Sequence, residues 1–119
     1  MTHILILEDD LSMRVLLRTL LEIEKFKVSI VETESATAIT ESITRLKPDI
    51  IFMDVNMSGL SGLSILKTIK SDPEQESIKV VMTSGEDLQN ACSAAGADGF
   101  FLKPYRPSDL IQKLRTLKN

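Results

Sequence analysis

Five polar residues in this 119-residue sequence stand where short apolar runs end, and three of them are acids. They are Glu8, Asp9, Asp54, Ser84 and Lys103. Runs that are apolar at every position are typical of strands buried on both faces of a parallel sheet. The carboxyl ends of such strands share one edge, where ligands bind. We therefore expect three carboxylates, a hydroxyl and an ammonium to converge on one shallow pocket.

Three carboxylates cannot lie close together without compensation. At about 4 Å and an effective dielectric constant of about 20, each pair costs on the order of 4 kcal/mol. Either the pKa of one acid rises or a cation binds, and Mg²⁺, held by one or two carboxylates, waters and a phosphate, matches an open site. A carboxylate nucleophile beside Mg²⁺ and a lysine suits phosphoryl transfer, so the expected product is an acyl phosphate on Asp54.

Asp54 also has a simpler interpretation. It ends the run that begins at Asp49, and a lone aspartate after a strand commonly caps a turn, here the one before Ser58 and Gly59. The acids and the lysine at the other strand ends favour the chemical interpretation. Asp10, by contrast, is expected to cap a helix and not to bind metal.

Five apolar runs alternate with five amphipathic segments. The expected strands are residues 4–7, 28–31, 49–54, 78–83 and 100–102. The helical segments repeat apolar residues every three to four positions. Their expected inward residues are Met13, Leu16, Leu17, Leu20 and Leu21; Ala36, Ile39, Ile43 and Leu46; Ile65, Leu66 and Ile69; Leu88, Ala91, Cys92 and Ala95; and Leu110, Ile111, Leu114 and Leu117. This alternation predicts an α/β fold, with a five-stranded parallel sheet and helices on both faces.

The composition excludes several classes of protein. Hydrophobic residues make up 43% of the chain and charged residues 26%, which are ordinary values for a globular protein. The net charge of −3 argues against direct nucleic-acid binding, which depends on a basic surface. Cys92 is the only cysteine, so no internal disulfide is expected, and no apolar stretch is long enough for a signal peptide or a spanning helix. We expect one domain over residues 1–119, in the cytoplasm and without membrane association.

With these residues in place, the whole chain resembles the receiver domain of two-component response regulators, in its stand-alone, chemotaxis-regulator-like form. The matching residues are the acidic pair Glu8-Asp9, the phosphoacceptor Asp54, the switch hydroxyl Ser84, the switch aromatic Phe100, and Lys103-Pro104 with its cis-proline bond. The resemblance implies a flavodoxin-like fold with strand order 2-1-3-4-5. It also implies Mg²⁺ bound by Asp9, Asp54 and the backbone carbonyl of Asn56, with Glu8 acting through water.

The resemblance further implies a role in signal transduction. Asp54 would receive a phosphoryl group from a histidine kinase or a histidine phosphotransfer protein, as in a phosphorelay, and the altered surface would bind a downstream effector protein. Such a protein is not an enzyme acting on other substrates, although it assists its own phosphorylation and dephosphorylation. We expect a monomer or a weak dimer.

Three features depart from the pattern of the resembling family. Ser58 stands where the family usually has proline, which is expected to loosen the loop after Asp54. Lys79 replaces another common proline, which is expected to be harmless. The segment from Ser84 to Gly96 is about one helical turn short, so the fourth helix is expected to run only over residues 87–95 and to be loosely held.

Alternatives remain for the whole protein and for single residues. The run from Asp54 to Ser58 faintly resembles the aspartate-nucleophile phosphatases of the haloacid dehalogenase type, but Asn56 stands where their general acid belongs. A non-phosphorylated interaction module is a third possibility. A flavin-binding protein is disfavoured because acids follow the first strand in place of a phosphate-binding loop. Phe100 is as compatible with core packing as with a switch, and His3 is not expected to take part in chemistry.

Overall fold

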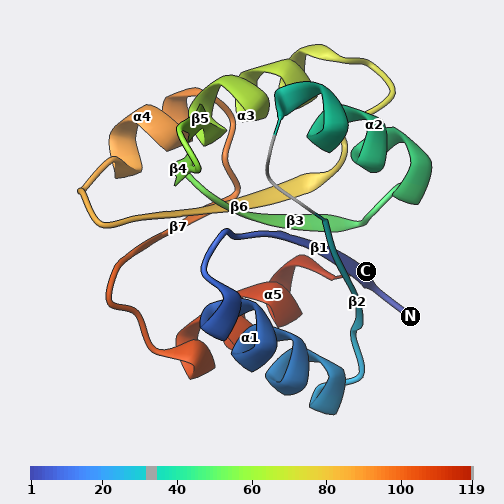
Figure 1. Ribbon diagram of the computed structural model, residues 1–119, viewed down its shortest axis with the longest axis vertical. Helices are drawn as coiled ribbons and strands as arrows, with labels where there is room; N and C mark the ends of the chain where they lie inside the picture. Colours follow the sequence, from blue (N-terminus) through green and yellow to red (C-terminus); the bar gives the residue numbers. More distant parts are fainter. Residues whose placement is uncertain (32–34, 119) are drawn as a thin grey trace.

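A computed structural model describes residues 1–31 and 35–118 and arranges them in three layers (Figure 1). The central layer is a parallel sheet of β1 (His3–Leu7), β2 (Lys27–Ile30), β3 (Ile50–Asp54), β6 (Lys79–Ser84) and β7 (Gly99–Leu102). The helices are α1 (Leu11–Ile23), α2 (Ala36–Leu46), α3 (Gly62–Ser71), α4 (Gln89–Ala94) and α5 (Pro107–Leu117). Helices α1 and α5 cover one face of the sheet, and α2, α3 and α4 cover the other (Figure 1).

The order of strands in the sheet is β2-β1-β3-β6-β7, and every neighbouring pair is parallel. Because β6 and β7 are the fourth and fifth of these strands along the chain, this is the predicted order 2-1-3-4-5, and the flavodoxin-like fold class is confirmed. One feature was not predicted. A short antiparallel hairpin, β4 (Asn56–Met57) and β5 (Leu60–Ser61), links β3 to α3.

The sheet has a separate hydrophobic core on each face. Along β1, Leu5 and Leu7 belong to the core that includes residues of α2 and α3, whereas Ile4 and Ile6 belong to the core that includes residues of α1 and α5. All five residues of β1, and likewise of β3, are buried. Burial on both faces explains why these strands read as continuous apolar runs in the sequence, without the alternation of a half-exposed strand.

Side chains cap the first three helices. Asp10, Ser35 and Ser61 each accept a hydrogen bond from the backbone N–H three residues further on, at the start of α1, α2 and α3. The predicted cap at Asp10 is thereby confirmed. Helix α4 has no side-chain cap, which removes a contribution of about 1 kcal/mol to helix stability.

The predicted inward stripes are corrected at three positions. The first is Ala36, which is exposed at the start of α2. Leu16 is 43% exposed, because α1 contacts the sheet through a narrow stripe that includes Leu17 and Leu21. Ala91 is exposed, and Cys92 is the buried residue of α4. Helix α4 is also shorter than the predicted residues 87–95.

The length of the described helices also bears on membrane association. Within residues 1–31 and 35–118, no helix combines the length and the apolar character needed to cross a membrane.

Candidate functional site

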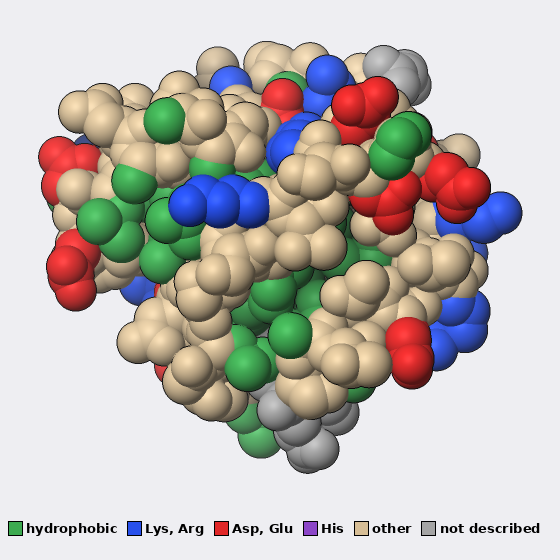
Figure 2. Space-filling view, turned by 90° about the horizontal axis from the view of Figure 1, so that it is seen from above, with side chains coloured by type: hydrophobic (Ala, Val, Ile, Leu, Met, Phe, Trp, Pro, Cys, Tyr) green, Lys and Arg blue, Asp and Glu red, His purple; other side chains and the backbone are tan. Residues whose placement is uncertain are grey.

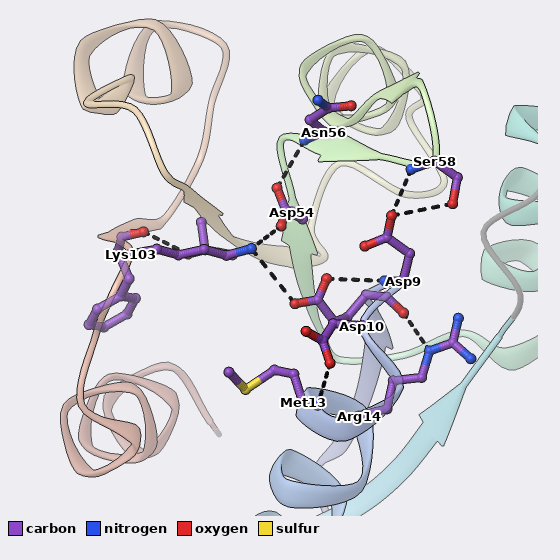
Figure 3. Close-up of polar contacts among 11 residues, drawn as sticks. Asp9, Asp10, Met13, Arg14, Asp54, Asn56, Ser58 and Lys103 are labelled. Atoms are coloured by element: carbon purple, nitrogen blue, oxygen red, sulfur yellow. Dashed lines mark hydrogen bonds and ion pairs between the residues drawn. The ribbon is translucent and has the colours of Figure 1, made fainter.

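Four of the five predicted site residues come close together at the carboxyl edge of the sheet (Figure 3). They are Glu8, Asp9, Asp54 and Lys103. Strands β1 and β3 are neighbours in register, with Leu7 opposite Met53, so the acids that follow β1 lie beside Asp54. Lys103 follows β7 and reaches across the end of β6. Its Nζ forms an ion pair with Asp54 and lies 3.8 Å from Oε1 of Glu8. Segments about 50 residues apart in sequence therefore meet at one edge, as the fold class predicts.

Both carboxylate oxygens of Asp54 accept a hydrogen bond from a neighbouring residue. Asp54 is only 7% exposed, its Oδ1 accepts a hydrogen bond of 3.0 Å from the N–H of Asn56, and its Oδ2 is bound by Lys103. The backbone around it is closely packed. A Cβ placed on Gly62 would overlap the carbonyl oxygen of Asp54, so this position accommodates only glycine.

Glu8 is the most buried acid of the site, with 3% of its surface exposed. Burial raises the pKa of Glu8, the charge of Lys103 opposes this effect, and the charge of Asp54 adds to it. Oε2 of Glu8 accepts a hydrogen bond of 3.0 Å from the N–H of Asp9, and this bond favours the ionised form of Glu8. The raised pKa of Glu8 therefore comes mainly from burial, and the neighbouring carboxylates add less to it.

Asp9 has the opposite environment. Its side chain is exposed, and its Oδ2 accepts two hydrogen bonds from Ser58, one from the N–H at 2.8 Å and one from the hydroxyl at 3.3 Å. The backbone hydrogen bond from Ser58 is the main cause that lowers the pKa of Asp9, and burial opposes it. Ser58 thus ties this loop to the end of β1, and the expectation that serine loosens the loop relative to proline stays a prediction.

Lys103 is positioned by the strand beside it. Its backbone N–H donates to the carbonyl of Ser84 at 2.8 Å, and the bond from Lys103 to Pro104 is cis, as the resemblance implies. Burial alone would lower the pKa of Lys103, but the hydrogen bond to Asp54 and the charges of Asp54, Glu8 and Asp9 outweigh it and raise the pKa. The lysine is therefore a fixed cation between two acids.

The two predicted switch residues lie on β6 and β7, where Ser84 ends β6 and Phe100 lies within β7. Ser84 is buried, and its hydroxyl oxygen accepts a hydrogen bond of 3.1 Å from the N–H of Glu86. Phe100 is partly buried and packs against the core on the α4 side of the sheet. This position is compatible with both interpretations of Phe100, so its role as a switch stays a prediction.

Two residues near the site were not expected from the sequence. Arg14 of α1 donates a hydrogen bond from Nε to the backbone carbonyl of Glu8 (Figure 3). Tyr105 packs edge-on against Phe52, and its buried hydroxyl has no hydrogen-bond partner among the described residues. Burial, with the charges of Glu8 and Asp54, raises the pKa of Tyr105 to about 12. The only sequence signal for Tyr105 is its place two residues after Lys103.

The donor groups of the site fit Mg²⁺ better than a metal that needs a closed protein cage. Among the described residues, no group of three or more His, Cys, Asp or Glu side chains is arranged to hold a metal ion. Mg²⁺ does not need such a group, since it binds one or two carboxylates and keeps several waters. The carboxylate oxygen of Asp9 that Ser58 leaves free points toward Asp54 (Figure 3). Two carboxylates at an open, hydrated edge are a suitable set.

Comparison with known proteins gives a consistent result. The family model for the response regulator receiver domain matches residues 4–115. The chain is 35% identical over 114 residues to the two-component response regulator ORR6 of Oryza sativa, covering 91% of this chain and 66% of that protein. It is 27% identical over 118 residues to the DNA-binding response regulator MtrA of Mycobacterium tuberculosis, covering 95% and 49%. The chain thus spans between about half and two thirds of the length of these relatives.

Solved structures show the same fold at lower sequence identity. The chemotaxis response regulator CheY4 of Vibrio cholerae superposes with a TM-score of 0.87 at 21% identity, over 99% of both chains. The signal receiver domain of a histidine kinase from Syntrophus aciditrophicus superposes with a TM-score of 0.86 at 24% identity, covering 98% of this chain and 89% of that one.

Proposed function

The chain belongs to the response regulator receiver domain family, and from this premise we propose that Asp54 accepts a phosphoryl group from a phosphohistidine. The reaction would depend on Mg²⁺, and phosphate on Asp54 would switch a protein-binding surface. The observation that carries the proposal is the environment of Asp54. It is a buried carboxylate at the carboxyl end of the middle strand, with Lys103 on one oxygen and two further acids beside it.

The chemistry follows from these positions. A carboxylate oxygen of Asp54 attacks the phosphorus atom, the new O–P bond forms as the P–N bond breaks, and the imidazole of the donor leaves. Lys103 then pairs with an oxygen of the transferred group, where its charge stabilises the extra negative charge. Mg²⁺, held by Asp9, Asp54 and the carbonyl of Asn56, with Glu8 acting through water, would supply further charge neutralisation. The same groups would orient water for dephosphorylation.

The surface beside the site supports a helical protein as the phosphodonor. Leu11 and Val15 lie one turn apart on α1, directly after the acids, and are 69% and 61% exposed. Exposed large apolar side chains at this spacing are suited to packing against another helix. We therefore propose a histidine kinase or a histidine phosphotransfer protein as the donor, in the cytoplasm.

The other side of the molecule supports an output surface. Hydrophobic side chains gather at the α4 end of the face that carries α2, α3 and α4 (Figure 2). A shallow groove of about 330 Å³ lies close by and is lined in part by Gln89, Phe100 and Lys113. Phosphate on Asp54 adds about −1.5 to −2 charges, which Ser84 and Phe100 would relay to this surface. A downstream effector protein would bind here, while the chain itself stays a monomer or a weak dimer.

Intact mass spectrometry tests the proposal. Incubation with acetyl phosphate and Mg²⁺ should increase the mass of the wild-type protein by one phosphate. The increase should disappear in EDTA and in Asp54→Asn, because the first removes the cation and the second removes the nucleophile. Unchanged labelling of Asp54→Asn would contradict the assignment of Asp54, whereas labelling in EDTA would contradict the role of Mg²⁺.

A further inference from the structure

The turn between β4 and β5 makes a direct contact with the end of β1. Ser58 and Asp9 are 49 residues apart, yet the N–H and the hydroxyl of Ser58 both donate to Oδ2 of Asp9. The 2.8 Å bond from the N–H is the shorter of the two, and the hydroxyl lies at 3.3 Å. A backbone N–H that donates to a carboxylate makes a charge-assisted hydrogen bond, which is stronger than a neutral one.

The conformation of the turn leaves this N–H available. Met57 pairs with Leu60, so Ser58 and Gly59 form a two-residue turn, and their φ angles are 48° and 82°. Positive φ at both central positions is the mark of the type I′ turn of β-hairpins. The N–H of the first turn residue is not used within such a hairpin, and here it meets Asp9. A proline at position 58 would have no N–H and could not adopt this φ.

The contact also orients the carboxylate of Asp9. Ser58 occupies one oxygen of Asp9, and the other oxygen points toward Asp54 (Figure 3). We propose that Ser58 is a positioning residue, which holds the free oxygen of Asp9 toward the site and thereby strengthens the binding of Mg²⁺. This inference rests on the proposed function, because it concerns the cation that phosphoryl transfer would use.

The expected size of the effect follows from related chemistry. Removing a hydrogen-bond donor that orients a metal ligand typically weakens metal binding by about 10-fold to 100-fold. Ser58 and Asp9 are both exposed to water, which can replace part of the interaction, so we expect the lower end of this range. The effect should come mainly from the N–H, since the hydroxyl bond is the longer of the two.

Four variants separate the donor from the shape of the turn. Ser58→Ala and Ser58→Gly keep the N–H and should bind Mg²⁺ within about 3-fold of wild type, whereas Ser58→Pro should bind about 10-fold more weakly. Gly59→Ala is the matched control, because its added Cβ strains the same turn through the backbone without meeting any atom within 4 Å and leaves the donor in place. Mg²⁺ affinity is measured by calorimetry, and unfolding in EDTA checks that each variant is folded.

Each result has a definite meaning. A loss confined to Ser58→Pro supports the inference, and equal losses in Ser58→Pro and Gly59→Ala overturn it, since the shape of the turn would then be the cause. Wild-type affinity in all four variants also overturns it while leaving the proposed function intact. If the wild-type protein itself binds no Mg²⁺, the proposed function fails and the inference fails with it.

Hydrogen exchange at the amide of Ser58 provides a second measurement that needs no substitution at this position. The amide should be protected without Mg²⁺, should stay protected when Mg²⁺ is saturating, and should lose protection in Asp9→Ala. Loss of protection on adding Mg²⁺ to the wild-type protein would show that Ser58 and the cation compete for Asp9, which is the opposite of positioning.

Discussion

The two ends of the central sheet differ in how their polar side chains are paired. At the amino end, Asp98 accepts hydrogen bonds from Lys70 and from the N–H of Val80, at 3.3 and 2.9 Å. His3 is joined there to Ser29 by a hydrogen bond of 2.7 Å. Each of these groups has a partner of complementary charge or polarity, so this end of the sheet is held together by its own side chains.

At the carboxyl end, the charges do not balance. Glu8 and Asp54 share Lys103, Asp9 is bound by the neutral donors of Ser58, and burial raises the pKa of Glu8. The excess negative charge costs stability in the absence of a cation, and a bound cation recovers it. The groups that stabilise the fold and the groups of the proposed site therefore lie at different ends of one sheet. Substitutions at the amino end should lower stability alone, while those at the carboxyl end should change the response to Mg²⁺ and phosphate.

The largest expected loss of stability lies at the carboxyl end, because the backbone around Asp54 is closely packed there. It would show that one position at this end also matters for stability. Gly62→Ala should lower the free energy of unfolding by about 3 kcal/mol, since its Cβ would overlap the carbonyl oxygen of Asp54. Gly85→Ala is the control at the same edge, because its Cβ would meet nothing within 4 Å. Urea unfolding of both variants checks the prediction, and similar stability of the two would show that the loop around Asp54 adapts.

A smaller loss is expected at the amino end. Asp98→Ala should lower the free energy of unfolding by about 2 kcal/mol, because it leaves the buried N–H of Val80 without an acceptor. Lys70→Met removes the partly exposed ion pair and keeps that acceptor, so it should cost less than about 1 kcal/mol. Both variants should accept phosphate on Asp54 as the wild type does. Impaired labelling of the folded Asp98→Ala protein would contradict the division between the two ends.

The lysine at the carboxyl end should affect stability and Mg²⁺ in opposite directions. Lys103→Met should lower the metal-free stability by about 1 kcal/mol, because Glu8 and Asp54 lose a shared cation whose own side chain is 35% exposed. Mg²⁺ should bind this variant at least as tightly as wild type. At a concentration ten times the dissociation constant, Mg²⁺ should raise the free energy of unfolding by roughly 1.4 kcal/mol. Unfolding with and without Mg²⁺ measures both quantities. Weaker Mg²⁺ binding by the variant would mean that Lys103 helps to assemble the cation site.

The smallest expected effect is a pH dependence at the amino end. Burial lowers the pKa of His3, the charge of Lys27 adds to this effect, and the charge of Asp49 partly opposes it. The unfolded chain therefore takes up a proton before the folded protein does. The contribution of His3 to stability is complete above about pH 6.5 and is lost as the pH falls toward the lower, folded-state pKa.

His3→Gln isolates this contribution, since glutamine does not titrate. Between about pH 7.5 and about pH 5.5, the free energy of unfolding of the wild-type protein should fall by up to about 1 kcal/mol more than that of the variant. Equal losses in the two proteins, measured by urea unfolding, would show that His3 is protonated as easily in the folded state as in the unfolded chain.

The sequence predicts the fold and the position of the acids for a definite physical reason. Strands buried on both faces must be apolar throughout, so their ends can be located, and the rules of parallel sheets bring those ends to one edge. For this reason, the closeness of Glu8, Asp9 and Asp54 could be predicted without coordinates. The same rules place Lys103 on this edge, although they do not say which acid it pairs with.

The contacts made by loops could not be predicted in this way. The bond from Ser58 to Asp9 depends on a positive φ that serine adopts only in its folded context, and the pattern of residues contains no signal for it. Helix α4 is also shorter than its apolar pattern suggests, since the pattern does not mark the residue at which a helix begins. Leu16 of α1 was predicted to be buried and is exposed. The periodicity of apolar residues gives the direction of a side chain but not the width of the buried stripe.

Asp54 alone should form the acyl phosphate, and chemical trapping can locate the phosphorylated residue. After incubation with acetyl phosphate and Mg²⁺, reduction with borohydride converts a phosphorylated aspartate to homoserine, which peptide mass spectrometry locates in the sequence. We predict homoserine at position 54 and at no other acid of the site, and none after incubation in EDTA. Homoserine at position 9 or 10, or its absence from a fully folded protein, would contradict the account.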